Sequence, residues 1–254
     1  MTPAVDWDAA AYDRVSRPQA EWAREVLARL RLAGNETVLD AGIGSGRPAA
    51  ALLERLPNGR LIGVDSSPSM IEKAREAIGS DPRVELRVAD LLDLDLDQAV
   101  DIVLSTATFH WILDHDRLFA RLYAALRPGG RMEAQCGGEG NAAEVVRVVD
   151  SLSGDGRFSA YLRPAVLPWN FPSVGDTEVR LRRAGFDVDR VWLEQRPVTP
   201  GDPRAFVATA ILPWHLDRLP PELRDEFVTA VLAAMPGQLE IRYVRLNISA
   251  RKPG

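Results

Sequence analysis

The sequence predicts an α/β protein with a doubly wound, mostly parallel sheet, and two observations carry this prediction. The first is a short apolar strand at 37–41 that leads through the glycine-rich turn Gly42-Ile43-Gly44-Ser45-Gly46 into a helix with Pro48 in its first turn. Proline fits there because the first N–H groups of a helix have no partner within it. The second is a regular alternation of apolar strands and helices along the chain that follows, which is typical of βαβ units.

Apolar spacing and turn residues define the individual elements. We expect seven strands, at 37–41, 59–65, 84–90, 100–105, 131–136, 188–194 and 240–250. We expect the last two to pair antiparallel as a hairpin at the edge of the sheet. Beyond the helices of the first βαβ units, helices are expected at 19–32, 116–126, 142–152, 176–184, 206–216 and 221–235. Pro128-Gly129-Gly130 should end the helix at 116–126 and turn the chain into the fifth strand.

Composition narrows the class of protein. The chain of 254 residues is 46% hydrophobic, which is enough for a substantial core. A net charge of −5 disfavours general binding of nucleic acid, because that requires a basic face. The single cysteine, Cys136, excludes a disulfide framework and a cysteine zinc site, and we expect it to be a buried thiol. With no recognisable signal peptide and no apolar stretch long enough to span a bilayer, we expect a cytoplasmic protein with no membrane partner.

The spacing of the glycines limits the ligand that the turn can hold. A dinucleotide fingerprint reads G-x-G-x-x-G, whereas this turn reads G-x-G-x-G and places Arg47 where the third glycine belongs. Gly42 and Gly44 allow backbone angles that other residues avoid, and they leave room for a ligand. The carboxylate of Asp40, just before the turn, would repel a pyrophosphate but suits a ligand with an ammonium group.

Polar residues also stand at the ends of the next three strands. Asp65 is placed to accept hydrogen bonds from a ribose diol, and Asp90 can accept one from an adenine amino group. Ser105 ends the fourth strand. Because open α/β sheets bind ligands at the carboxyl ends of their strands, these residues predict one shared site.

This ordered series of motifs, VLDAGIGSG, GVDSS, VADLLDL and DIVLSTATFHW, resembles the class I S-adenosylmethionine-dependent methyltransferases. The resemblance covers about residues 36–135 and extends more loosely to both ends. There the chain is similar to the trans-aconitate methyltransferase group in YDRVSRP at 12–18, Phe109-His110-Trp111, LRPGG at 126–130 and Tyr243-Val244-Arg245-Leu246. The resemblance implies a Rossmann-like sheet, a helical lid and S-adenosyl-L-methionine as the cofactor.

The resemblance also implies which residues would hold this cofactor. The N-terminal segment would fold over it, with Tyr12 and Arg17 reaching the methionine carboxylate. Equally, Tyr12 could pack on the lid and Arg17 could be a surface charge. Met70 would contact the adenine, although core packing also accounts for a lone methionine. The full expected set is Tyr12, Arg17, Asp40, Gly42, Gly44, Asp65, Ser66, Met70, Asp90, Leu91 and Ser105.

The loop after the fourth strand is expected to face the methyl acceptor. The resemblance places His110 near the transferable methyl group as the catalytic residue. Trp111 either walls the substrate site or plugs the space beneath the loop. Further along the chain, Trp169 and Phe171 would wall a small apolar or planar substrate. Arg163 could hold a substrate carboxylate with its forked donors, or it could form a surface ion pair.

Two polar features near this loop have plainer explanations than metal binding, and we expect no metal. His115 lies beside Asp114 and Asp116 and is expected to take part in capping a helix. The aspartates of LLDLDLD at 91–97 alternate with leucines, which predicts a solvated acidic rim. A calcium loop would need a glycine at its turn, and this segment has none.

We divide the chain into four regions on this basis. Residues 1–35 form an N-terminal lid and helix, and 36–136 form the cofactor-binding core. Residues 137–175, with their glycines, prolines and aromatic residues, form a cap inserted over the site. Residues 176–254 complete the core and contain inserted helices.

The predicted reaction is transfer of a methyl group from S-adenosylmethionine to a small-molecule acceptor, at a carboxylate or hydroxyl oxygen. A carboxylate needs no base, whereas a phenol or a carbon acid needs one, and His110 is then the available group. The sequence lacks the D/N-P-P-F/Y motif that suits methylation of adenine amino groups. It also lacks the Pro-Cys dipeptide that suits methylation of cytosine carbon.

Three other functions remain as alternatives. A nicotinamide-dependent oxidoreductase is disfavoured by Arg47 and Asp40 at the glycine turn. A non-catalytic, regulatory S-adenosylmethionine-binding protein would keep the cofactor residues without turnover. A methyltransferase acting on a carrier-bound acyl group would need a basic docking patch. The sequence specifies neither the acceptor nor the oligomeric state.

Overall fold

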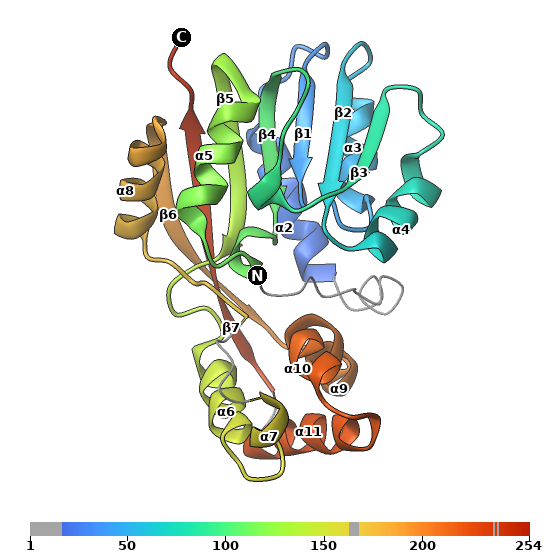
Figure 1. Ribbon diagram of the computed structural model, residues 1–254, viewed down its shortest axis with the longest axis vertical. Coiled ribbons are helices and arrows are strands. Elements are labelled where there is room, and N and C mark those ends of the chain that lie inside the picture. Colours follow the sequence, from blue (N-terminus) through green and yellow to red (C-terminus); the bar gives the residue numbers. More distant parts are fainter. Residues whose placement is uncertain (1–16, 163–167, 236, 238) are drawn as a thin grey trace.

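A computed structural model describes residues 17–162, 168–235, 237 and 239–254, and its centre is one seven-stranded sheet (Figure 1). The strands lie in the order β3-β2-β1-β4-β5-β7-β6. Neighbours among β1 to β5 pair parallel, and β7 pairs antiparallel with both β5 and β6. The predicted doubly wound sheet with an antiparallel edge hairpin is therefore confirmed. The strands are β1 (Thr37–Ala41), β2 (Arg60–Asp65), β3 (Val84–Val88), β4 (Val100–Thr106), β5 (Leu126–Gly137), β6 (Asp187–Val198) and β7 (Ile241–Arg251).

Helices cover both faces of this sheet. Val38 and Leu39 of β1 pack into different hydrophobic clusters because successive side chains of a strand point to opposite faces. The face of Val38 is covered by α2 (Arg17–Arg29), α3 (Arg47–Glu54) and α4 (Pro68–Ile78). The face of Leu39 is covered by α5 (His115–Ala125) and α8 (Val174–Ala184). Among the helices of the described residues, none is long and apolar enough to cross a membrane.

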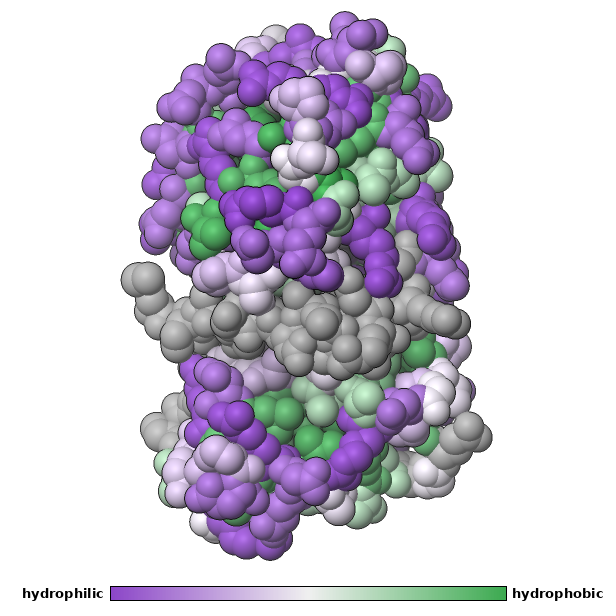
Figure 2. Space-filling view, turned by 90° about the vertical axis from the view of Figure 1, so that its right-hand side faces the viewer, coloured by the Kyte–Doolittle hydropathy of each residue, from purple (hydrophilic) through white to green (hydrophobic). Residues whose placement is uncertain are grey.

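A third hydrophobic cluster forms a helical cap beyond one end of the sheet, reached along β6 and β7 (Figure 1). Two separate segments build it. The first contains α6 (Ala143–Ser153) and α7 (Ser159–Leu162), and the second contains α9 (Pro203–Phe206), the π-helical turn η3 (Val207–Ile211), α10 (Pro213–Arg218) and α11 (Pro221–Ala234). Figure 2 shows mainly hydrophilic residues on the visible face of the core and a hydrophobic area on that of the cap.

Two element predictions are wrong in detail. The single helix expected at 206–216 is divided, because Leu212 leaves the helical angles (φ −99°, ψ 6°) and Pro213 starts a new helix. The fifth strand begins at Leu126, not at Arg131, because Leu126 already pairs with Val100 of β4. The glycines expected to end the helix thus lie inside the strand.

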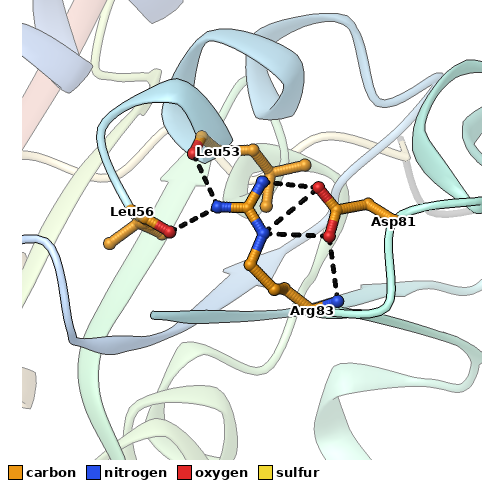
Figure 3. Close-up of polar contacts among 4 residues, drawn as sticks. All are labelled: Leu53, Leu56, Asp81 and Arg83. Atoms are coloured by element: carbon orange, nitrogen blue, oxygen red, sulfur yellow. Dashed lines mark hydrogen bonds and ion pairs between the residues drawn. The ribbon is translucent and has the colours of Figure 1, made fainter. Parts of the chain in front are cut away.

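Arg83 ties the start of the edge strand β3 to the end of α3 (Figure 3). Its guanidinium donates to the carbonyl oxygens of Leu53 and Leu56, at 3.2 and 2.5 Å, and pairs with the carboxylate of Asp81. A cation is favourable there because the last carbonyl groups of a helix have no partner within it. The side-chain hydrogen bonds from Arg83 lower the pKa of Asp81 to about 2. This contact fixes the βαβ unit that carries the glycine turn.

Gly46, the last glycine of the turn, lets α3 and α4 approach closely. It has φ +76°, and an added Cβ atom would lie 3.1 Å from the Cα atom of Ala74 in α4. Gly129 has the same φ of +76° but has no atom within 4 Å of the same position. Alanine variants at these two positions therefore distinguish the cost of backbone strain from the cost of disturbed helix packing.

We predict that Gly46→Ala destabilises the protein more than Gly129→Ala does. Both variants put alanine in the left-handed region, which costs about 1–2 kcal/mol. Only Gly46→Ala also forces α3 and α4 apart, which should add roughly 1 kcal/mol or more. Thermal and urea unfolding of both variants without ligand would measure the difference, and equal losses would show that the close approach of the helices is unimportant.

Candidate active site

The glycine turn after β1 is held by the backbone of β2. The N–H groups of Gly42 and Ile43 both donate to the carbonyl oxygen of Val64, at 2.8 and 3.1 Å. Gly42 and Gly44 have φ values of +88° and +56°, as the glycine pattern predicts. The reason for Gly42 differs from the expected one, since an added Cβ atom would lie 2.1 Å from Oγ1 of Thr108 and not in ligand space. At Gly44 the same position is open, so Gly44 is the glycine that leaves room.

Asp65, at the end of β2, organises this turn. One carboxylate oxygen accepts a hydrogen bond from the N–H of Gly44 at 3.0 Å, and the other accepts from the N–H of Ser67 at 2.9 Å. Burial raises the pKa of Asp65, and the hydrogen bonds from Ser67, Gly44 and Ser66 oppose that rise. A carboxylate has about four lone-pair sites, so with three backbone donors bound Asp65 can still accept a hydrogen bond from a ribose.

Asp40 is a second buried carboxylate, with 3% of its surface exposed. Burial, and then the charge of Asp65, raise its pKa to about 7. Two carboxylates in one desolvated region repel each other, and a bound cation would relieve that repulsion. The site is therefore electrostatically prepared for a positively charged ligand on the side of Asp40.

The ends of β3 and β4 contribute to the same edge of the sheet. The carboxylate of Asp90 is exposed and accepts from the N–H of Leu92 at 2.9 Å, while Leu91 is buried. Met70, in the first turn of α4, is 5% exposed. The hydroxyl of Ser105 donates to the carbonyl oxygen of Ala41 at 2.6 Å and so ties β4 to β1. The cofactor contacts expected of these residues stay predictions.

Three predicted residues cannot be placed in this site. Tyr12 and Arg163 lie outside the described residues. Arg17 begins α2, but the description covers only its backbone. Their expected roles at the methionine carboxylate and at the acceptor remain predictions.

Four aromatic rings meet beyond the end of β4, and we name His110, Trp111, Trp169 and Phe171 the aromatic quartet. The ring centroids of His110 lie 5.3 Å from Trp111 and 5.9 Å from Phe171. Those of Trp169 lie 6.3 Å from Trp111 and 6.1 Å from Phe171, so the contacts close into a ring. The fold thus brings His110, Trp111 and Trp169 together from distant parts of the sequence.

Backbone contacts fasten the two segments of the quartet to each other. The N–H of Asn170 donates to the carbonyl oxygen of His110 at 2.9 Å, and its side-chain amide donates to that of Leu113 at 3.0 Å. Just before the 3₁₀ turn η2 (Phe109–Trp111), Ala107 has a φ of +57° and donates to the carbonyl oxygen of Gln135 at 2.7 Å. A left-handed alanine is strained, and strain of this kind is frequent at functional loops.

His110 is a buried imidazole whose surroundings favour its neutral form. It is 9% exposed, and its Nδ1 atom accepts a hydrogen bond from the N–H of Gly137 at 3.3 Å. Burial, followed by the positive charge of Arg245, holds the pKa of His110 well below its usual range. The group therefore carries no charge at neutral pH.

The expectation that His115 helps to cap a helix is wrong. Asp114 caps α5, since its carboxylate accepts from the N–H of Arg117 at 2.9 Å. His115 is buried, with its Nε2 atom 2.9 Å from the carbonyl oxygen of Phe109. His115 thereby links η2 to the hydrophobic core, because its ring also contacts Phe119 of α5.

No role was predicted for two residues that lie around His110, Gly137 and Arg245, whereas Phe171 was expected at the acceptor together with Trp169. Gly137 must lack a side chain, since an added Cβ atom would lie 2.6 Å from the ring of Phe171. Arg245 is 2% exposed and pairs opposite Gly137 between β7 and β5. The available signal was that Arg245 alternates in phase with Ile241 and Tyr243, which marks an inward-facing charge.

The acidic segment after β3 is surface structure. Asp93 forms an ion pair with Arg117 of α5, and Arg117 also donates to the carbonyl oxygen of Leu92 at 2.9 Å. Among the described residues, no group of three or more histidine, cysteine, aspartate or glutamate side chains is arranged to hold a metal ion. The thiol of Cys136 is buried, and burial raises its pKa to about 12, so it is not a nucleophile.

Comparison with known proteins agrees with this geometry. A family model described as methyltransferase domain matches residues 38–130. The trans-aconitate 2-methyltransferase of Methylobacterium radiotolerans is 30% identical over 92% of this chain and 90% of its own length. The chain belongs to the class I S-adenosylmethionine-dependent methyltransferases, in the trans-aconitate methyltransferase group. The relative of the same name from Methylobacterium nodulans is 29% identical over 98% of this methyltransferase and 99% of its own chain.

Solved structures share the fold of this methyltransferase. A putative methyltransferase from Bacillus halodurans superposes with a TM-score of 0.64 at 17% identity, over 91% of this chain and 99% of that one. Phosphoethanolamine N-methyltransferase 2 from Haemonchus contortus, in complex with S-adenosyl-L-methionine, superposes with a TM-score of 0.60 at 20% identity. This match covers 97% of this chain and 57% of that one. The predicted enzyme class and cofactor are thus confirmed by the family, and the predicted fold by these structures.

The residues of the site fit S-adenosylmethionine. Gly44 leaves open space beside the turn, Asp65 retains acceptor capacity, and Asp40 suits a cationic ligand. Arg47 starts α3 where a dinucleotide site would have its third glycine. The alternative function as a nicotinamide-dependent oxidoreductase is therefore rejected, because the chain belongs to the methyltransferase family and its turn lacks the third glycine of a dinucleotide site.

We predict that Asp65→Ala weakens binding of S-adenosylhomocysteine by roughly 10- to 100-fold, because hydrogen bonds to a carboxylate contribute about 1.5–3 kcal/mol. Part of this loss of affinity would arise because the glycine turn loses its hydrogen bond from Gly44 to Asp65. Titration calorimetry would measure it, with Asp93→Ala as the matched control, since that aspartate pairs with Arg117 on the surface. Unchanged affinity in Asp65→Ala would remove the ribose assignment.

We predict that Asp40→Asn stabilises the ligand-free protein at pH 8. The folded pKa of about 7 exceeds the ordinary value of 3.8, so the stability present at low pH falls as pH rises through 7. The asparagine removes this loss, which is on the order of 2–4 kcal/mol. Unfolding in urea at pH 5 and pH 8 would measure it. If both proteins showed the same pH dependence, Asp40 would not be the titrating group. The variant should also bind S-adenosylmethionine less tightly.

Proposed function

We propose that this enzyme methylates a carboxylate oxygen of a small, planar, polyanionic acid. The observation that carries the proposal is the positive charge of the buried Arg245, which acts on His110 and makes this part of the site electropositive, so that an anionic acceptor is favoured there. The aromatic quartet supports it, since flat rings pack well against a planar, unsaturated acid. The names of the 29–30% identical relatives point to the same class, with trans-aconitate as the first acceptor to test.

The catalytic contribution that we infer for this chain is alignment in a dry site. S-adenosylmethionine, when bound, supplies the methyl group already activated on its sulfonium. The glycine turn and Asp65 would hold the nucleoside, and Trp111 and Trp169 would wall the acceptor. Alignment of two bound reactants can supply on the order of 7–11 kcal/mol in favourable cases. A carboxylate is ionised at neutral pH, so no residue has to remove a proton from it.

We infer that the four regions of the chain are arranged around this site. Residues 1–35 would form the N-terminal lid and helix, and 137–175 the cap insertion over the acceptor. Residues 36–136 would form the cofactor-binding core, and 176–254 would complete the core and contain inserted helices, which pack in the helical cap. A small-molecule acceptor, no nucleic acid and a cytoplasmic location agree with the net charge of −5 and with the free, buried Cys136.

We predict that the enzyme converts trans-aconitate to a methyl ester with S-adenosylmethionine as donor. Mass spectrometry would detect one added methyl group, and mild alkali would remove it, because an ester hydrolyses where an ether or an N-methyl group does not. The matched control is the trimethyl ester of the same acid, which offers no carboxylate and should give no product. A base-stable product, or transfer only to phenols, would overturn the carboxylate assignment.

A further inference from the structure

The hydrogen bond between Gly137 and His110 fixes where the imidazole carries its proton. Because the backbone N–H of Gly137 can only donate, the Nδ1 atom of His110, 3.3 Å away, must be the unprotonated acceptor. A neutral imidazole has one ring proton, which is therefore on Nε2. Among the described residues, Nε2 has no hydrogen-bond partner. The ring thus presents an N–H donor and has no lone pair left to act as a base.

Packing holds the ring in this orientation. The ring of Phe171 stacks on His110 at 5.9 Å, with an angle of 24° between the planes, and Trp111 lies at its side. The N–H of Asn170 holds the carbonyl oxygen of His110. Gly137 in turn is fixed by its pairing with Arg245 between β5 and β7. Rotating the imidazole would break the Gly137 contact and the stack together.

The charge around His110 favours an anion. Arg245 is the charged group on β7 that acts on the ring, and its positive charge adds to burial in disfavouring the imidazolium. His115, which faces the loop from α5, also has a pKa lowered by burial and stays neutral. Cys136 on β5 keeps its proton because burial raises the pKa of its thiol to about 12. A ligand at this position therefore meets a neutral donor and one buried cation.

We propose that His110 is a fixed hydrogen-bond donor and not a base, and that its Nε2–H group and the charge of Arg245 together hold the carboxylate of the acceptor. The donor would hold one carboxylate oxygen and leave the other free to form a bond to the methyl carbon. The bond between that carbon and the sulfonium sulfur would break with its electron pair going to sulfur, so that neutral S-adenosylhomocysteine and the methyl ester result. No proton is transferred in this arrangement. The inference rests on the proposed function for the identity of the acceptor, but the state of the imidazole does not depend on it.

A matched pair of variants separates the donor role from the Gly137 contact. The amide nitrogen of glutamine can occupy the position of Nε2, so His110→Gln keeps a donor there. The shorter His110→Asn can reach Gly137 but not the Nε2 position. With trans-aconitate at saturating S-adenosylmethionine, we expect His110→Asn to raise KM about 10- to 100-fold, as for loss of a hydrogen bond to a charged group. We expect His110→Gln to stay within about fivefold.

Binding and spectroscopy complete the test. Calorimetric titration of trans-aconitate into each variant with S-adenosylhomocysteine bound should show the same order of affinities, while the affinity for S-adenosylhomocysteine itself stays constant. Nitrogen NMR of the wild-type imidazole should show an Nε2–H tautomer from pH 6 to 9. Equal losses in both variants, or a His110 ring that is protonated at pH 6 or carries its proton on Nδ1, would overturn the proposal.

The design also separates failure of this inference from failure of the proposed function. If the acceptor is not a carboxylate, trans-aconitate gives no ester, yet the NMR result still decides whether His110 is a donor. If the ester forms but His110→Gln and His110→Asn behave alike, the function stands and the donor role is wrong. A phenol acceptor with a rate that depends on the His110 lone pair would contradict both.

Discussion

The antiparallel insertion of β7 between β5 and β6 is the constraint on which the rest of the structure depends. One strand of eleven residues enters three environments in succession. Ile241 and Tyr243 pack in the core of the cap, Arg245 lies beside His110, and Leu246, Ile248 and Ala250 complete one face of the sheet. Because register in a sheet is all-or-none, a shift of one residue would move Arg245 to the other face and remove Tyr243 from the cap. The cap and the proposed acceptor site are therefore placed by the same hydrogen-bond ladder.

The site keeps charges in positions that are unfavourable without ligands. The pKa of Asp40 is raised to about 7, first by burial and then by the charge of Asp65, so the ionised form of Asp40 is disfavoured here. Near His110 the local charge is positive instead of negative, and the charge of Arg245 disfavours a second cation there. One side of the site thus suits a cationic ligand and the other an anionic one. Preorganised charges of this kind favour a transfer in which a cation and an anion react and both charges disappear.

The sequence predicted what depends on short spacing, and it failed where distant segments meet. The glycine turn, Asp65 and the cap of α5 follow from residues a few positions apart. Two contacts join residues that are far apart in the sequence, so no local pattern predicts them. They are the close approach of Gly42 to Thr108 and the hydrogen bond from Gly137 to His110. His115 was assigned to a helix cap because Asp114 and Asp116 are its neighbours in sequence, whereas tertiary packing turned its ring inward onto Phe109 and Phe119. The Pro213 break was readable in principle, since proline removes a helical donor.

The aromatic quartet separates two tasks that a methyltransferase must perform. His110 and Trp111 come from the loop after β4, which is fixed to the cofactor turn through Thr108 and its bond to the carbonyl oxygen of Gly42. Trp169 and Phe171 come from the segment after α7, and Trp169 also contacts His215 of the cap. In the proposed function, the loop on the sheet would align the methyl group with the acceptor, while the cap segment would set the shape of the acceptor site. Among the described residues, Asn170 bonds and ring contacts join these two segments, so we expect that the cap can change with the acceptor while the loop after β4 keeps its geometry.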